Sequence, residues 1–111
     1  MMINEEELKG IHEEIIFWKR VLDNTRDRLR KLHKEKDEAE SELRDFRISS
    51  SSYDLQDPGY YYYSCNRTMG IKMREEKIAN LDEQIDYFEK VTLYVKEEIN
   101  KLYTKAGMLL V

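Results

Sequence analysis

The sequence predicts an all-α protein: an antiparallel two-helix coiled-coil hairpin that pairs with a second copy to form a four-helix bundle dimer. Three observations lead to this fold class. Apolar residues recur with alternating spacings of three and four over residues 8–46 and again over 71–109, which is the heptad pattern of a coiled coil. Charged residues make up 38% of the chain, as is typical of long amphipathic helices. The 111 residues include a single Pro, the strongest helix breaker, and the length suits one domain.

The first helix is expected over residues 5–47. Asn4 stands where an N-cap is needed, and Glu7 follows it at the spacing of a capping box. A helix with an apolar stripe gains most of its stability from whatever packs over the stripe, so a second helix is required. The predicted core positions are, at a, Leu8, Ile15, Leu22, Leu29, Lys36 and Leu43, and, at d, Ile11, Trp18, Thr25, Leu32, Ala39 and Phe46.

A Ser/Tyr-rich connecting loop is predicted over residues 48–69. Consecutive serines at 49–52 disfavour helix, the Asp57-Pro58-Gly59 sequence indicates a turn, and the tyrosine run that follows is β-prone. Loops this long are unusual between helices and are often functional. We therefore expect a partner-binding tip, with the alternative that its tyrosines cap the helix ends. The tip residues are Tyr53, Tyr60, Tyr61, Tyr62, Tyr63 and Arg67.

The second helix is expected over residues 70–106, or to the C-terminus. Gly107 could end it as a C-cap, but Leu109 remains in phase with the heptads. The core positions are, at a, Ile71, Ile78, Ile85, Thr92, Ile99 and Ala106, and, at d, Arg74, Leu81, Phe88, Val95, Leu102 and Leu109.

Antiparallel pairing of these helices, with Leu8 opposite Leu109, gives every core layer a partner. The polar residues Thr25 and Thr92 then face each other, and this layer is expected to fix the register, because an unpaired buried hydroxyl costs about 1–3 kcal/mol. Flanking charges also match in this register. The expected ion pairs are Glu42 with Lys77, Glu14 with Lys105 and Arg26 with Glu89.

Five apolar residues remain outside the two-helix seam, at c and g positions on one lateral side. They are Phe17, Val21, Tyr87, Val91 and Tyr94. Contiguous exposed apolar surface usually marks an interaction site, so we expect a homodimer interface here. In the alternative, these side chains lie flat against the stems of charged neighbours.

The sequence contains no pattern that indicates catalysis, a cofactor or a metal site. His12 and His33 are too far apart along one helix to share a metal, and Cys65 lacks a neighbouring ligand. The net charge of −4 argues against a nucleic-acid binder. No segment reaches the length and hydropathy of a membrane span, and the acidic N-terminus does not resemble a signal peptide. We expect a cytoplasmic protein that is not an enzyme, has no cofactor and does not bind a membrane.

These observations favour a small protein-binding module, an adaptor or inhibitor of a larger protein target. It would dimerise through the lateral side and contact its target through the tyrosine-rich tip. Two alternatives remain open. One is a nucleic-acid-associated protein that uses the basic part of helix one, and the other is a purely structural component that assembles only with itself. The basic residues in question are Arg26, Arg28, Arg30, Lys31, Lys34 and Lys36.

Overall fold

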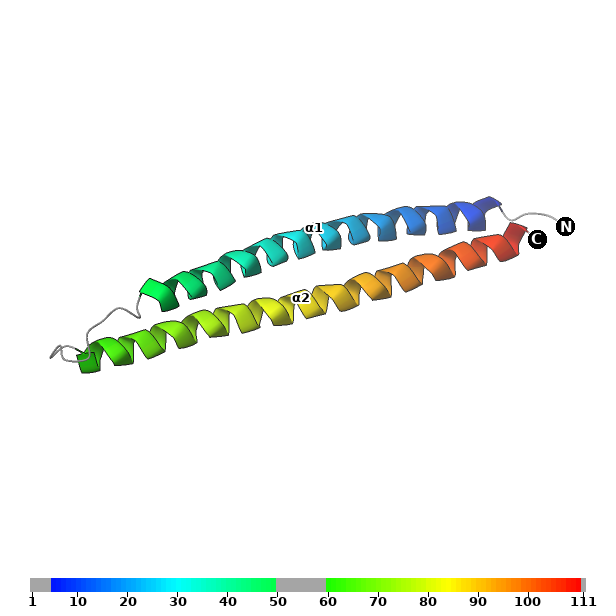
Figure 1. Ribbon diagram of the computed structural model, residues 1–111. Helices are drawn as coiled ribbons and strands as arrows, with labels where there is room; N and C mark the ends of the chain where they lie inside the picture. Colours follow the sequence, from blue (N-terminus) through cyan, green and yellow to red (C-terminus); the bar gives the residue numbers. More distant parts are fainter. Residues whose placement is uncertain (1–4, 50–59, 111) are drawn as a thin grey trace. The chain divides into compact units, whose positions relative to one another are not determined.

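The computed structural model describes residues 5–49 and 60–110, with side chains other than those of residues 60–64 and 109–110. It contains helix α1 (Glu5–Ser49) and helix α2 (Tyr60–Leu110), which pack against each other as a two-helix hairpin (Figure 1). The predicted all-α class is confirmed. Neither described helix has a stretch apolar and long enough to cross a membrane.

The heptad stripe is the packing face of both helices. Every predicted a and d residue of α1 is buried or half-buried, and so is every predicted one of α2 from Ile71 to Ala106. Leu32 and Val95 are the most completely enclosed, at 0% and 1% exposure. Leu109 lies outside the described side chains. The spacing of apolar residues alone therefore locates the buried surface.

The helix boundaries differ from those expected between residues 47 and 70. Helix α1 continues to Ser49, and α2 begins at Tyr60 rather than near residue 70, so much of the expected loop is helical. The expected loop included the tyrosine run, which the structure places at the start of α2. Tyrosine is only modestly less favourable than Ala in a helix, and a helix that is already nucleated by packing extends at little cost per residue.

The chain divides into two compact units, and the first comprises Met1–Arg30 and Asp86–Val111. Its core cluster consists of Leu22, Val95 and Ile99, against which Trp18, Val21 and Val91 pack. Apolar side chains from both helices contribute to this cluster, so burial of the α1 stripe in this unit depends on α2.

The two threonines of the first unit satisfy their hydroxyls locally. Thr25, 7% exposed, donates to the Val21 carbonyl at 2.8 Å, and Thr92 donates to the Phe88 carbonyl at 2.9 Å. Both are bonds to the residue four positions earlier in the same helix. A change of register would leave neither hydroxyl unpaired, so the expectation that the threonine layer fixes the register is not supported by its hydrogen bonds.

Ion pairs join α1 to α2 in the second unit, Lys31–Ile85. Lys36 Nζ lies 2.6 Å from Asp82, and Arg47 lies 2.6 Å from Glu75. Glu42 contacts Lys77 at 3.9 Å, which confirms one expected pair. Each such exposed pair contributes less than about 1 kcal/mol. These contacts nevertheless depend on register, because each joins one specific position of α1 to one of α2.

A close approach between the helices of the second unit occurs at Gly70. A Cβ atom there would lie 2.6 Å from Cζ of Phe46. The Arg74 guanidinium covers the same ring at 3.9 Å from its centroid and donates to the Gly70 carbonyl at 3.1 Å. Glycine at position 70 therefore leaves room for the Phe46 ring beneath the Arg74 cation, an arrangement favoured by cation–π attraction.

The glycines offer a matched test of this packing. Gly10 has no atom within 4 Å of an added Cβ, so Gly10→Ala is expected to stabilise α1 by about 0.5–1 kcal/mol through helix propensity. Gly70→Ala should show no such gain, because the methyl group displaces the Phe46 ring. Chemical denaturation followed by circular dichroism measures both. Equal stabilisation by the two variants would contradict the close packing at Gly70.

Candidate functional surface

The five residues expected at a dimer interface all belong to the first unit. We call Phe17, Val21, Tyr87, Val91 and Tyr94 the lateral patch. Phe17, Tyr87 and Tyr94 are 58%, 60% and 54% exposed, whereas Val21 and Val91 are half-buried and pack on the core cluster. The patch therefore has an exposed aromatic surface above two valines that are held by the core.

Trp18 connects the two helices beneath the lateral patch. This half-buried side chain meets Phe17 edge-on with ring centroids 5.4 Å apart, and it meets Tyr94 of α2 in the same way at 6.0 Å. Tyr87 makes a similar contact with Phe88 at 5.2 Å. Edge-to-face pairs hold aromatic rings in defined orientations. The exposed rings are thus supported by the half-buried rings of Trp18 and Phe88.

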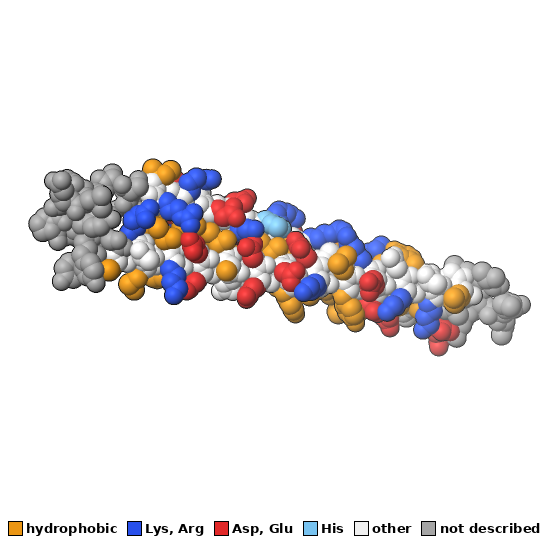
Figure 2. Space-filling view, turned by 60° about the horizontal axis from the view of Figure 1, so that its bottom comes forward, with side chains coloured by type: hydrophobic (Ala, Val, Ile, Leu, Met, Phe, Trp, Pro, Cys, Tyr) orange, Lys and Arg blue, Asp and Glu red, His pale blue; other side chains and the backbone are white. Residues whose placement is uncertain are grey.

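Other hydrophobic side chains are exposed on these helices, as the orange groups among charged ones show (Figure 2). Ile16 and Leu93 are 40% and 61% exposed. Tyr103, 49% exposed, has the Lys19 ammonium 5.5 Å from its ring centroid. Isolated apolar side chains are normal on protein surfaces. The lateral patch differs from them because Phe17 and Tyr94 both meet Trp18, which packs on the core cluster together with Val21 and Val91.

The tyrosine-rich tip is described only in part. Tyr53 lies outside the described residues, and Tyr60 to Tyr63 form the start of α2 with side chains that are outside the description. Arg67 is half-buried and donates to the Arg47 carbonyl at 3.5 Å. Carbonyls in the last turn of a helix lack partners within that helix. Arg67 therefore helps to cap the end of α1.

The basic stretch of α1 is partly neutralised by neighbouring carboxylates. Arg30 pairs with Asp27 at 2.8 Å, and Lys36 pairs with Asp82 at 2.6 Å and Glu40 at 3.8 Å. Cations held by carboxylates are less available to phosphates, and dense unpaired positive charge is what nucleic-acid binding requires. Two of the six basic residues are thus held by carboxylates, and the nucleic-acid alternative stays a prediction.

Lys36 occupies a core position but keeps its charge beside Asp82. The hydrogen bond to Asp82 raises the pKa of the Lys36 ammonium above its ordinary value of 10.5, and this outweighs the opposing effect of desolvation. A group whose pKa is raised by folding stabilises the fold below its unfolded pKa and loses that contribution as the pH rises through its folded pKa. The Lys36–Asp82 contribution should therefore be constant at neutral pH and decrease only above about pH 10.5, as the pH rises through the raised pKa of Lys36.

Asp82→Asn tests this linkage. The variant is expected to have a lower melting temperature than the wild type at pH 8, with the difference shrinking as the pH rises beyond the Lys36 pKa. Glu83→Gln serves as the control, because Glu83 is exposed and makes no ion pair with a described residue. Melting curves at several pH values measure both variants. A difference for Asp82→Asn that stays constant through pH 11 would contradict the assignment.

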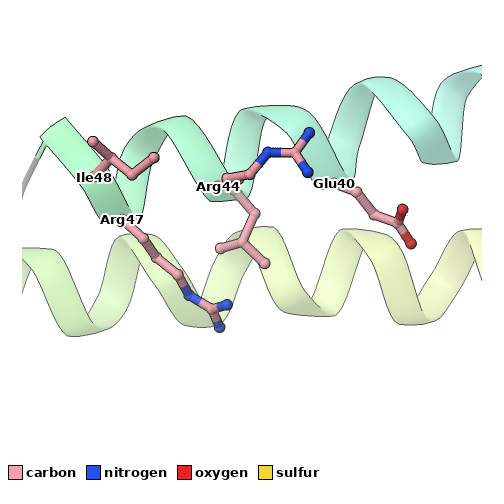
Figure 3. Close-up of a pocket in the computed structure, with 5 residues that line it drawn as sticks. Glu40, Arg44, Arg47 and Ile48 are labelled. Carbon is pink, nitrogen blue, oxygen red and sulfur yellow. The ribbon is translucent and has the colours of Figure 1, made fainter.

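A shallow hollow of about 460 Å³ in the second unit is lined by α1 residues. The lining residues are Glu40, Leu43, Arg44, Arg47 and Ile48. Arg47 points towards α2 (Figure 3), where its guanidinium is paired with Glu75. Within the described part of the chain, no three His, Cys, Asp or Glu side chains are placed to hold a metal ion. Cys65 is an exposed thiol. The hollow is therefore bordered by the Arg47–Glu75 ion pair and by the apolar side chains of Leu43 and Ile48.

The dimer interface at the lateral patch remains a prediction, with all five of its residues placed in the first unit. Sequence reasoning did not identify the part played by Trp18, which had been expected only as a large core residue, or the packing of Phe46 between Gly70 and Arg74. The sequence signal for the packing of Phe46 is a glycine, Gly70, next to a core layer that contains an aromatic residue. No family model matches the chain, and no curated protein or solved structure is significantly similar to it.

Proposed function

We propose that this chain is a small non-enzymatic protein-binding module of the cytoplasm, an adaptor or inhibitor of a larger protein. In this proposal an antiparallel coiled-coil hairpin dimerises through the lateral patch into a four-helix bundle and contacts its target with the tyrosine-rich tip. The observation that carries the proposal is the patch itself: three aromatic side chains more than half exposed, two of them joined through Trp18. Aromatic residues supported in this way are characteristic of interface cores.

The antiparallel arrangement is supported by the order of contacts in the second unit. Lys36 of α1 pairs with Asp82, whereas Arg47, further along α1, pairs with Glu75, which is earlier in α2. Partner numbers that fall as residue numbers rise are expected for antiparallel helices. The four-helix bundle follows from the patch, because two hairpins that bury the same lateral surface bring four helices together.

The target-binding part of the proposal rests on the composition of the tip. Tyrosine provides a large contact area with few rotatable bonds, and it is enriched among residues that dominate binding energies. The chain carries four consecutive tyrosines at 60–63, directly beside the connection between its helices. In the alternative, these tyrosines cap the helix ends and contact no target.

Affinity capture on the immobilised chain, with and without nuclease, tests this function. We expect a discrete protein to be retained after nuclease treatment and in high salt, and to be lost when residues 60–63 are all changed to Ser. Loss on nuclease treatment, or a steep decrease with salt, would instead indicate nucleic-acid binding. Retention of the same protein by the Ser variant would exclude the tip as the contact, and capture of only the chain itself would favour the structural alternative.

A further inference from the structure

We propose that the partner on the lateral patch is a second copy of this chain in one defined orientation, with the two α1 helices antiparallel across a two-fold axis near Val21. Glu14 of each copy then lies beside Arg28 of the other. This inference rests on the proposed dimer and adds its geometry. It is carried by the charges that flank the patch on α1.

Glu14, Val21 and Arg28 share one stripe of α1. They are spaced by seven residues, so all three occupy g positions of the heptad pattern. Each interval spans about 10.5 Å along the helix at about 1.5 Å per residue. Val21 is therefore midway between an acidic and a basic residue, and it is also the α1 member of the patch that packs on the core cluster.

A two-fold axis through Val21 and perpendicular to α1 reverses the second helix, so that position 14 of one copy meets position 28 of the other. Both such contacts join Glu to Arg. The other simple arrangement, with the axis along the helices, would place Glu14 against Glu14 and Arg28 against Arg28. Like charges across an interface are unfavourable and direct a complex away from that orientation. Charge complementarity thus selects the antiparallel dimer.

Both charged side chains are available for this contact. Glu14 and Arg28 are exposed, and neither forms an ion pair with another residue of the described chain. In particular, the expected Glu14–Lys105 pair is not formed. The neighbouring acid Asp27 is held by Arg30 at 2.8 Å, so it does not compete for Arg28. On this stripe of g positions, Val21 is therefore flanked by one acid and one base that have no ion-pair partner among the described residues.

Charge reversal tests the orientation directly. Glu14→Arg makes both contacts of the dimer arginine against arginine, and Arg28→Glu makes both glutamate against glutamate. Each variant alone is expected to raise the dimer dissociation constant by roughly tenfold or more, since two attractive pairs become repulsive. In a mixture of the two variants, both contacts of the heterodimer join Arg to Glu, so the heterodimer should be tighter than either homodimer and close in affinity to the wild-type dimer. The double variant Glu14→Arg/Arg28→Glu restores an attractive pair at both contacts and should recover the wild-type dissociation constant.

Sedimentation velocity measures these constants, and circular dichroism shows whether each variant keeps its helices. The possible results distinguish a wrong orientation of the two copies from the absence of any dimer. If the wild type dimerises but the double variant does not recover its affinity, the orientation is wrong and the dimer stands. If the wild-type chain is monomeric, the proposed dimer fails as well. Lys34→Glu, a charge reversal on α1 beyond the first unit, should leave the dissociation constant within about twofold of wild type, because exposed charges outside an interface contribute little.

Discussion

Replacing Val91 with Asp is expected to convert the proposed dimer to monomers. Val91 lies at the junction between the core cluster and the exposed aromatic rings, where association would bury it further. A carboxylate at this position would have to lose its hydration without gaining a positively charged partner, which costs several kcal/mol. A two-fold dimer contains two copies of the substitution, so the effect is doubled. Light scattering of the purified variant measures the result.

The partial burial of Val91 makes a second variant necessary. Phe17 is 58% exposed, so Phe17→Ser removes patch surface with little effect on the hairpin itself, and it should also weaken the dimer. Leu93→Asp is the matched control: Leu93 is 61% exposed on the same helix as Val91 but outside the patch. An unchanged molar mass for both Val91→Asp and Phe17→Ser, with helices intact, would exclude the patch as the interface.

Leu32→Ala is expected to cause the largest loss of stability of any single truncation described. The Leu32 side chain is fully buried, at 0% exposure. Removing a buried leucine side chain sacrifices its transfer free energy and leaves a cavity, which together cost about 2–5 kcal/mol. In a protein whose total stability is only about 5–15 kcal/mol, such a loss shifts the unfolding transition strongly.

Leu93→Ala provides the comparison at an exposed leucine and should change the free energy of unfolding by about 0.5 kcal/mol or less. Urea denaturation followed by helical circular dichroism measures both variants. Equal effects of the two substitutions would show that residue 32 is not in the core and that the heptad stripe is misplaced.

The buried face of the fold could be predicted from sequence because it depends on a simple period. Every third or fourth residue of a helix returns to the same side, so the apolar spacing from Leu8 to Phe46 determines which side is covered. Lys36 and Arg74 fit this logic despite their charge. Their stems occupy the seam while their cations reach Asp82 and the Phe46 ring at its border.

The start of α2 and the hydrogen bonds of the two core threonines could not be predicted from the heptad pattern, because they depend on interaction energies that residue spacing does not give. The start of α2 at Tyr60 reflects extension from a packed helix, which overrides the weak preference of single tyrosines for strands. The hydroxyls of Thr25 and Thr92 could have bonded across the seam or within their own helices. In the structure both hydroxyls donate within their own helices, to backbone carbonyl oxygens at 2.8 Å and 2.9 Å. Heptad position alone does not distinguish these choices, because both place the threonine at the same core site.

The position of the lateral patch was predictable because c and g positions lie beside the seam, where Val21 and Val91 also pack on the core cluster. Its support by Trp18 was not, since that requires the ring orientations that bring Phe17 and Tyr94 edge-on to the indole. The orientation proposed for the dimer uses both the spacing of residues in the sequence and the contacts seen in the structure. The stripe of Glu14, Val21 and Arg28 is visible in the sequence, but the absence of other ion pairs to these residues within the described chain is visible only in the structure.

In the proposed dimer, the lateral patch joins two copies of the chain. Sedimentation equilibrium of the wild-type protein over a wide concentration range tests it most directly. We predict a molar mass that rises with concentration to twice the 13.5 kDa of the chain and no further, because a two-fold interface is closed. A mass that remains at 13.5 kDa at every concentration, or that grows beyond the dimer without limit, would exclude a closed dimer through the lateral patch.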